Sequence, residues 1–353
     1  MAKQSLVYIG TYTRNNPSLG IYVYRYDPAS GALEFLSTAP KVDSPSYLAT
    51  SPDGRFLYAV VENDNGVIAS FAIDRDKGML RLLNQQSTHG AHPCHLALDR
   101  TGKWVVVANY SSGNVAVFPV EIDGSLGPAT DVLQQKGTGP NAARQEGPHA
   151  HSVTFDPAGR FLVVADLGAD KVFTYTLDTT KGKLVPAKTA SISMAPGSGP
   201  RHFAFHRSGK FAYAINELLS TITVLAYDGK EGSFTELQTI STLPEGWKGS
   251  STCADIDIHP NGKFLYGSNR GHDSIAMFAI DQRTGRLTSL GQEPIRGKTP
   301  RNFALSKDGR FLLVGGQETN NIVAFAVDPV RGRLTPTGKE WPVPAPVCIM
   351  FQE

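Results

Sequence analysis

The sequence predicts an all-β protein, a seven-bladed β-propeller with four antiparallel strands in each blade. Three observations lead to this prediction. A strand–turn–strand unit recurs about every 50 residues, a second hairpin follows each unit, and each end of the chain supplies half of a further unit. Repeats of this period are typical of propellers, in which only short and protected strand edges remain. We expect one domain over residues 1–353.

The first hairpin of each unit joins two apolar strands through a polar turn. Asp-Gly, Asn-Gly or Ser-Gly in the turns supplies the positive φ angles that tight hairpins require. The turn glycines lie 47 to 57 residues apart, at Gly54, Gly102, Gly159, Gly209, Gly262 and Gly309. The hairpins are SPDGRFLYAV (51–60), DRTGKWVVVA (99–108), DPAGRFLVVA (156–165), HRSGKFAYAI (206–215), HPNGKFLYGS (259–268) and SKDGRFLLVG (306–315).

The second hairpins occur seven times, against six complete first hairpins. We expect them at residues 21–35, 68–82, 115–127, 172–184, 222–234, 275–287 and 322–334. The chain ends account for the difference. LVYIGTY (Leu6 to Tyr12) matches a second inner strand, and APVCIMF (Ala345 to Phe351) matches a first one. Pairing the N-terminal strand with the C-terminal strand closes the ring. A pair of β-sandwiches would leave these two half-hairpins unexplained.

Composition and charge exclude several classes of protein. The formal net charge is +2, so no global basic field indicates nucleic-acid binding, and any attraction for a ligand must be local. The N-terminus lacks the pattern of a signal peptide, and no run of 18 apolar residues predicts a membrane span. Three widely spaced cysteines, Cys94, Cys253 and Cys348, indicate reduced thiols. We expect a cytoplasmic protein without membrane or nucleic-acid partners, a monomer or weak homodimer.

Aligning the units on their turn glycines shows where polar residues gather. Scaffold positions stay apolar, whereas the ends of the two inner strands vary and become polar. Eight residues before the glycine stand Ser46, Cys94, His151, Arg201, Ala254 and Arg301, with Val347 in the last strand. Seven before it stand Tyr47, His95, Ser152, His202, Asp255, Asn302 and Cys348. The second strands end at Tyr12, Glu62, Tyr110, Leu167, Glu217, Arg270 and Gln317.

These strand ends predict one pocket at a mouth of the central channel. Because the two inner strands are antiparallel, both sets of positions face the same end. His151, Arg201, Glu217, Arg270 and Arg301 should converge there. Two longer connections, 133–148 and 241–252, flank the pocket, and loops at the mouth of a rigid scaffold commonly shape a site. They carry four residues that could touch a ligand or simply face solvent: Arg144, Gln145, Trp247 and Lys248.

The residue types fit hydrolysis without a metal. Such chemistry needs a base to activate water and a positive group for the developing oxyanion. His151, Glu217 and the two arginines could supply that set, and arginines also pair with carboxylate or phosphate groups. The alternative is a set of ion pairs that seals the channel, which is the usual reading of one isolated Arg–Glu pair. Of the other histidines, we expect His149 to support His151. Most of His92, His95 and His202 are expected to be hydrogen-bonded packing residues.

Other chemistries lack their sequence patterns. The run Arg296 to Thr299 resembles the end of a phosphate-binding loop, but Gly291 is misplaced by one residue and no helix follows. There is no Gly-x-Ser-x-Gly elbow, HExxH or CxxC. Histidines 92, 95, 149 and 151 have few acidic neighbours of the kind that support metal ligands. We expect no metal and no cofactor.

The repeats resemble the bacterial lactonase family of seven-bladed propellers along essentially the whole chain. PHAHSVTFDPAGRFLVVADLGADKV, GPRHFAFHRSGKFAYAINE and FLYGSNRGHDSIAMF carry the resemblance. The family includes propeller-type 6-phosphogluconolactonases and is related to fungal carboxy-cis,cis-muconate cyclases. The resemblance implies hydrolysis of 6-phosphogluconolactone, the second step of the oxidative pentose phosphate pathway. It also implies a site of one His, two Arg and one Glu. These fall on His151, Arg201, Glu217 and Arg270.

The expected mechanism follows from this set. Arg201 and Arg270 grip the anionic substrate and stabilise the oxyanion, while His151, oriented by Glu217, takes a proton from water. Arg301 or Lys248 holds the phosphate of the phosphorylated sugar lactone. His149, His202 and Asn216 complete the expected substrate-binding set. Two alternatives remain open, namely an enzyme that opens another lactone or cyclises a muconate, and a non-catalytic propeller that binds a protein partner.

Overall fold

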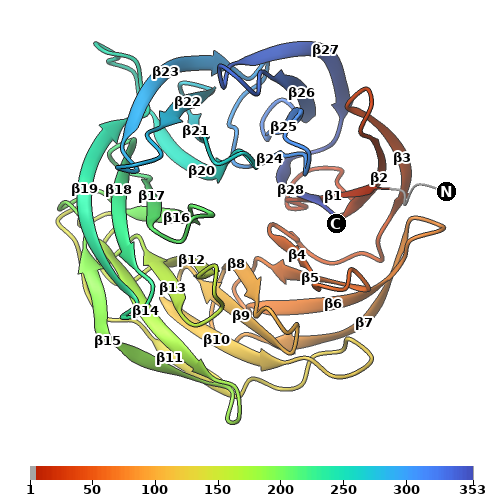
Figure 1. Cartoon of the computed structure of the whole chain (residues 1–353). Coiled ribbons are helices and arrows are strands. Elements are labelled where there is room, and N and C mark those ends of the chain that lie inside the picture. The colour runs from red at the N-terminus through yellow and green to blue at the C-terminus, as the bar shows by residue number, and fades with distance from the viewer. Residues whose placement is uncertain (1–4, 353) are drawn as a thin grey trace.

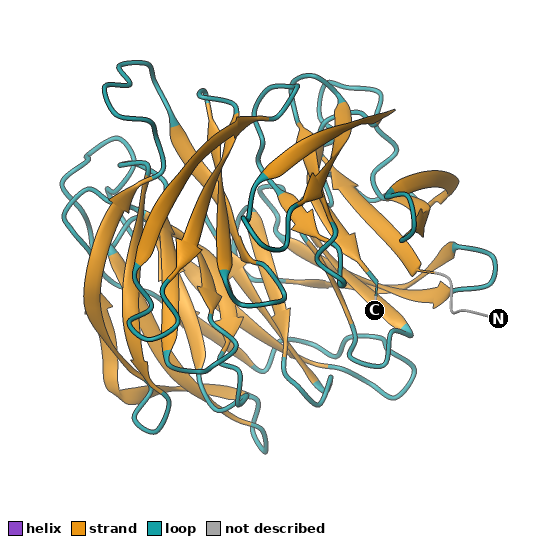
Figure 2. Cartoon of the chain, turned by 45° about the horizontal axis from the view of Figure 1, so that its top comes forward, coloured by secondary structure: helices purple, strands orange, loops and turns teal. Residues whose placement is uncertain are grey.

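The chain forms a ring of seven four-stranded antiparallel sheets around a central channel (Figure 1). The computed structural model describes residues 5–352. Strands fill these sheets, and loops join them at both ends of the ring (Figure 2). No helix occurs among residues 5–352, so none there could cross a membrane. The predicted fold class, an all-β seven-bladed propeller, is confirmed.

Each blade contributes one strand to each of four concentric layers. The innermost strands are β28 (Pro346–Phe351), β4 (Leu48–Thr50), β8 (Pro93–Leu98), β12 (Ala150–Phe155), β16 (Pro200–Phe205), β20 (Thr252–Ile258) and β24 (Phe303–Leu305). The second layer comprises β1 (Ser5–Thr11), β5 (Phe56–Val61), β9 (Trp104–Asn109), β13 (Leu162–Asp166), β17 (Phe211–Asn216), β21 (Phe264–Arg270) and β25 (Phe311–Gly316).

The outer half of each blade is the second hairpin of the repeat. The third layer comprises β2 (Tyr22–Asp27), β6 (Val67–Asp74), β10 (Asn114–Pro119), β14 (Lys171–Asp178), β18 (Thr221–Asp228), β22 (Ser274–Ile280) and β26 (Asn321–Val327). The outermost strands are β3 (Ala32–Thr38), β7 (Met79–Ser87), β11 (Asp131–Gln134), β15 (Lys183–Ser193), β19 (Ser233–Ser241), β23 (Leu287–Pro294) and β27 (Leu334–Pro342).

Burial explains why the inner strands are uniformly apolar and the outer ones are not. Every residue of β5 and β17 is buried, since blades pack against both faces of these strands. The outermost strand β7 instead consists of exposed and half-buried residues apart from the buried Leu80, with one face toward solvent. Side chains from neighbouring blades form shared apolar clusters, such as the one that joins β17 and β18 to β20, β21 and β22. This packing holds the rims of the channel in fixed positions.

The ring closes where the C-terminal strand β28 pairs with β1, as predicted. Val7 lies opposite Phe351, and Ile9 lies opposite Ile349, in an antiparallel register. Gln352, the residue after β28, makes two further hydrogen bonds where the ring closes. Its side chain accepts from the Tyr8 hydroxyl at 2.8 Å and donates to the Gly54 carbonyl at 2.6 Å. The last strand thus completes the first blade.

One predicted hairpin differs from the structure. We expected the second hairpin of the third unit within residues 115–127, but only an isolated bridge between Val120 and Leu126 forms there. The fourth strand of this blade, β11, begins at Asp131. Residues 127–130, which include Pro128, lie between this bridge and β11 and belong to no strand. The turn glycines, in contrast, behave as predicted, with φ between 67° and 74° at all six positions.

Candidate active site

A β-bulge recurs in the innermost strands near one mouth of the channel. The pairing of β16 with β17 skips Arg201, and the pairing of β12 with β13 skips His151. Three further blades carry the irregularity, at Cys94, at Ala254 and Asp255, and at Val347. A bulge interrupts the alternation of a strand and redirects the side chain of the extra residue. The bulges thus supply the residues that surround the mouth.

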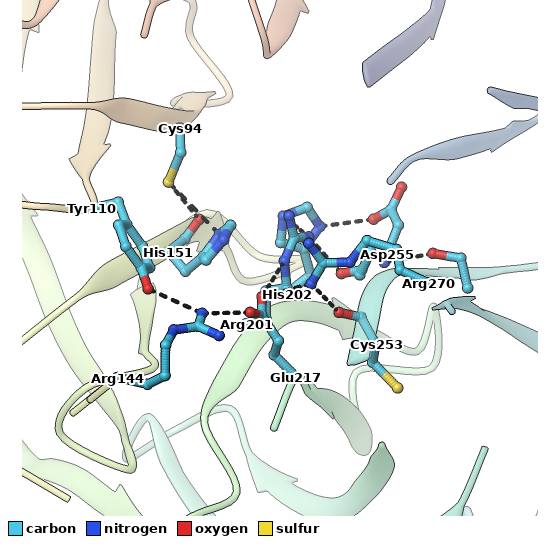
Figure 3. A network of polar contacts seen from close by, with 12 residues as sticks. Cys94, Tyr110, Arg144, His151, Arg201, His202, Glu217, Cys253, Asp255 and Arg270 are labelled. Atoms are coloured by element: carbon cyan, nitrogen blue, oxygen red, sulfur yellow. Dashed lines mark hydrogen bonds and ion pairs between the residues drawn. The ribbon is translucent and has the colours of Figure 1, made fainter. Parts of the chain in front are cut away.

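Glu217 is the centre of the polar cluster at this mouth (Figure 3). It follows β17, and its side chain is 6% exposed. Oε2 accepts from Arg201 Nε at 3.0 Å and from Arg270 Nη2 at 2.9 Å, and Oε1 accepts from Arg144 Nη2 at 2.6 Å. Burial acts to raise the pKa of Glu217, but the charges of Arg270 and Arg201 and the Arg144 hydrogen bond outweigh it. The pKa falls to about 2. Glu217 is therefore a carboxylate at neutral pH.

Arg201 is the most deeply buried cation of the cluster, with its side chain 2% exposed. Burial and the nearby charges of Arg270 and Arg301 lower its pKa to about 10, so it still carries its charge at neutral pH. Its Nη1 donates to the Ala254 carbonyl at 2.6 Å and lies 3.0 Å from His202 Nε2. The guanidinium is thus fixed on three sides by groups from β17, β16 and β20.

Arg270, at the end of β21, has fewer of its N–H groups hydrogen-bonded than Arg201. Its Nη2 donates to the Cys253 carbonyl at 2.8 Å and to Glu217. Its Nε is buried and has no hydrogen-bond partner among the described residues. A buried donor without an acceptor is costly, so this group is available to an oxygen of a ligand.

His151 lies beside this cluster and does not contact Glu217. Its Nδ1 is 3.6 Å from Cys94 Sγ, and its ring lies edge-on to the rings of Tyr110 and His202, with centroids 5.3 and 5.5 Å away. Burial, followed by the charge of Arg201, lowers the pKa of His151 well below 6.5. The imidazole is therefore neutral at pH 7 and able to accept a proton. The expectation that Glu217 orients His151 is wrong, because the side chains against the His151 ring are those of Cys94, Tyr110 and His202.

Tyr110 links the histidine side of the cluster to the arginine side. Its hydroxyl accepts from Arg144 Nη2 at 3.2 Å, and its ring stacks on His149 at 4.6 Å. His149 has partners for both ring nitrogens, the Tyr110 carbonyl and the Glu146 carboxylate. His149 therefore contacts Tyr110, whose ring lies edge-on to His151, and not His151 itself.

Arg301 stands on the opposite side of the mouth and has no carboxylate partner within ion-pair distance among residues 5–352. Its guanidinium lies over the Tyr12 ring, 5.3 Å from the centroid. The Tyr12 hydroxyl is 3.1 Å from both carboxylate oxygens of Glu62. Arg301 is half-buried and lines the same hollow as Arg201, which leaves its charge available to an anion.

Two hollows meet along the channel axis. The first, about 10 Å³ in volume, is bounded on the cluster side by Glu62, Arg201 and Arg301. The second, about 560 Å³, extends toward the hairpin turns, and Asp255 and Asp257 face it. Tyr47 and Asn302 line both. Arg201 and Arg301 border the smaller hollow, whose volume is about that of one water molecule, and neither borders the larger cavity.

The structure brings together most of the predicted residues, but not all of them. Arg201 and Arg270 each contact Glu217, and His151, His202 and Arg301 lie around them. Asn216 points away, since its amide donates to Thr221 and Thr223 within its own blade. Lys248 is exposed on the loop between β19 and β20. No group of three or more potential metal ligands lies together in the described part of the chain.

The sequence alone gave little reason to single out Arg144 and Asp255. Arg144 comes from the loop between β11 and β12, outside the repeats, although Gln145 beside it is buried and bonded to Asp170 and the Leu167 carbonyl. Asp255 stood in the aligned positions but had no distinguishing feature. Its bond to His202, 2.7 Å from Oδ1 to Nδ1, joins two blades. Neither contact is implied by spacing along the chain.

The fold and the mouth define a class: a β-propeller whose channel end holds a neutral histidine beside arginines around a buried carboxylate. The sequence model of the family described as "Lactonase, 7-bladed beta-propeller" matches residues 6–351. The chain belongs to this family.

Similar proteins cover most or all of the chain. The 6-phosphogluconolactonase of Bacillus subtilis (strain 168) is 39% identical over 297 residues, which is 84% of this chain and 83% of that protein. A solved Bacteroides fragilis structure, a candidate 6-phosphogluconolactonase, is 40% identical with a TM-score of 0.94, covering 100% and 99% of the two chains. The periplasmic gluconolactonase of Pseudomonas aeruginosa is 36% identical with a TM-score of 0.93, covering 99% of each chain.

Proposed function

We propose that the protein hydrolyses 6-phospho-D-glucono-1,5-lactone to 6-phosphogluconate, in the oxidative pentose phosphate pathway, without a metal. The observation that carries the proposal is the cationic mouth. Four guanidinium groups, those of Arg144, Arg201, Arg270 and Arg301, surround two carboxylates, Glu62 and Glu217. Such an excess of fixed positive charge favours an anionic substrate. The names of the relatives from Bacillus subtilis and Formosa agariphila support the same substrate.

The chemistry is general-base attack of water on the lactone carbonyl. His151 takes a proton from the attacking water, and Arg201 and the unpaired Nε of Arg270 stabilise the oxyanion. The bond between the carbonyl carbon and the ring oxygen then breaks, and protonated His151 returns the proton to the ring oxygen. The new carboxylic acid loses its proton to solvent. One proton is therefore released for each lactone hydrolysed.

Arg301 is the residue that best suits the phosphate. It faces the hollow and is free of any ion pair with a described carboxylate, whereas Lys248 is exposed on a loop. The Arg301→Gln variant is expected to have a kcat/KM for the phosphorylated lactone that is lower by roughly 10- to 100-fold. This is the effect of losing one charged hydrogen bond. The rate with plain gluconolactone should change little. Lys248→Gln is the matched variant, and loss of phosphate preference there instead would transfer the role to Lys248.

The first experiment is an assay of purified protein with 6-phosphogluconolactone in the presence of a chelator. Hydrolysis well above the spontaneous rate is expected, and His151→Ala and Arg201→Ala should each lose most of it while remaining folded. Full activity in both variants would refute the assignment. Loss of wild-type activity on chelation, with recovery on adding a metal, would refute the metal-free chemistry alone.

A second candidate is a lactonase that prefers an unphosphorylated sugar lactone. The relative named as a periplasmic gluconolactonase favours it. A panel of phosphorylated gluconolactone, plain gluconolactone and a muconate separates the candidates by kcat/KM. A protein-binding platform is less well supported, because exposed large apolar side chains are scattered over several blades, for example Phe35, Ile122 and Val330. The proposal assigns the enzyme to the cytoplasm as a monomer or weak homodimer, which fractionation and size-exclusion chromatography test.

A further inference from the structure

A chain of four polar groups runs from the mouth into the channel. Glu217 accepts from Arg201 Nε at 3.0 Å, Arg201 Nη1 lies 3.0 Å from His202 Nε2, and His202 Nδ1 lies 2.7 Å from Asp255 Oδ1 (Figure 3). All four residues are at most 7% exposed. Water therefore does not compete for these contacts, and each must be satisfied by the partner in the chain.

The donors and acceptors in this chain fix the tautomer of His202. A guanidinium can only donate, so His202 Nε2 must present its lone pair to Arg201. The single ring proton then lies on Nδ1 and is donated to Asp255. Burial, and next the charge of Arg201, lower the pKa of His202 well below 6.5, which keeps the ring neutral and makes this pattern possible. The opposite tautomer would set an N–H against an N–H of Arg201.

Asp255 is itself held rigidly between two blades. Oδ1 also accepts from the backbone N–H of Ile256 at 2.9 Å, and Oδ2 accepts from the Asn302 amide. The Asn302 side-chain oxygen in turn accepts from the backbone of Ile349 at 2.6 Å. The carboxylate thus cannot turn away without breaking its contacts to Ile256 in β20, to Asn302 and to Phe303 in β24. It has the rigidity that a group orienting another residue requires.

We propose that Asp255 is a positioning residue: it holds His202 in the Nδ1–H tautomer, so that His202 can accept from Arg201 and keep that guanidinium aimed at the substrate. The role rests on the proposed lactonase function, since Arg201 is the group that meets the oxyanion. Asp255 does not touch the substrate in this arrangement. It acts through His202, in the way that outer carboxylates orient histidines in other sites.

The test combines Asp255→Asn with a matched control, Asp257→Asn. Asp257 lies two residues along β20, is likewise in the channel interior, and accepts from the backbone of Ile258 without contacting His202. In the Asp255 variant one oxygen becomes an amide NH₂ group, which faces donors on either side. We expect kcat/KM to fall roughly 10- to 100-fold, the effect of a displaced catalytic group. Asp257→Asn should stay within about twofold of wild type.

Histidine ¹⁵N NMR reads the tautomer independently of turnover. Wild type and Asp257→Asn should show His202 as Nδ1–H, and Asp255→Asn should lose that pure signature. His202→Gln and His202→Asn give a second readout that does not require an Asp255 variant to fold. Glutamine extends an oxygen to the Nε2 position and can accept from Arg201, whereas asparagine stops short. His202→Gln should retain more activity, and Asp255→Asn should cost less than about threefold when added to it.

Several results would overturn the role of Asp255. These are an Nε2–H tautomer in wild type, unchanged kinetics in Asp255→Asn, equal losses in Asp255→Asn and Asp257→Asn, or equal activity of the two His202 variants. Failure of the proposed function looks different. A wild-type protein that turns over no lactone but shows His202 as Nδ1–H would refute the lactonase activity and retain the tautomer assignment.

Discussion

Arg144 and Glu217 lie 73 residues apart and meet through a hydrogen bond of 2.6 Å between Nη2 and Oε1. The two partners differ in their surroundings. The Arg144 side chain is 38% exposed and comes from a loop, whereas Glu217 is buried at the end of β17. The contact therefore joins a surface loop to the buried centre of the site. Of the three arginines that bind Glu217, Arg144 is the most exposed to solvent.

Removing Arg144 should weaken substrate binding more than chemistry. Arg144→Ala leaves Glu217 paired with Arg201 and Arg270, so the buried part of the site stays in place. We expect KM to rise about tenfold, the value of one charged hydrogen bond, while kcat falls less than threefold. Steady-state kinetics check this. Arg207→Ala, an exposed arginine bonded to the Pro260 carbonyl, is the control and should match wild type. A kcat loss larger than the KM change would contradict the prediction.

Neutralising Glu217 should destabilise the fold. Glu217→Gln leaves three guanidinium groups without their shared carboxylate, at a cost of about 3 kcal/mol in the free energy of unfolding. Chemical denaturation measures it, with Glu231→Gln as the control. Glu231 is exposed in a pair with Lys188, and losing that pair should cost less than about 1 kcal/mol.

The stability difference between wild type and Glu217→Gln should also depend on pH. The pKa of Glu217 is about 2 in the folded protein, against an ordinary value of 4.5. The folded state therefore binds fewer protons than the unfolded state between these values, so the contribution is complete above pH 4.5 and is lost as pH falls toward 2. A difference that stays constant down to pH 2.5 would contradict the assigned charge.

The acid limb of the activity profile should lie below pH 6.5. Burial and, next, the charge of Arg201 lower the pKa of His151, so the neutral, proton-accepting form persists as the medium becomes more acidic. We expect kcat to be flat from pH 8 to 6.5 and to decline only below that range. Using kcat reports the enzyme–substrate complex. The spontaneous hydrolysis rate must be subtracted at each pH, and a limb centred at pH 7 or above would contradict the prediction.

The closure of the ring should depend on Gln352. Gln352→Ala removes the acceptor of the buried Tyr8 hydroxyl and the donor to the Gly54 carbonyl, leaving buried polar groups unpaired. A loss of roughly 2 kcal/mol is expected in denaturant unfolding. Tyr8→Phe in the same background should recover part of it, because the unpaired hydroxyl is gone. If Gln352→Ala unfolds at the wild-type midpoint, these contacts do not stabilise the closure.

The fold could be predicted because its signals are local and repeated. Each of the six turn glycines marks one inner hairpin, and the pairing of β1 with β28 supplies the seventh. The same register located His151, Arg201, Glu217 and Arg270 at one mouth. The prediction failed in the third unit, where the fourth strand, β11, begins at Asp131 and not within residues 115–127.

The contacts within the site could not be read from the sequence in the same way. Glu217 was expected to orient His151, but it binds three arginines, one of them from a loop without a repeat. The bulges at Arg201 and His151 also could not be predicted, because they do not change the pattern of apolar residues along the strands. Which side chains meet depends on packing between blades, which is long-range.

The pairing of β28 with β1 has a consequence for synthesis on the ribosome. β1 ends at Thr11 and β28 begins at Pro346. β1 therefore cannot pair with β28 until the residues between them have been translated. At roughly 5–20 residues per second this takes on the order of 20 to 70 s. During that time the inner edge of the first blade has no partner strand. β1 is therefore exposed to pairing with a wrong strand until β28 emerges from the ribosome.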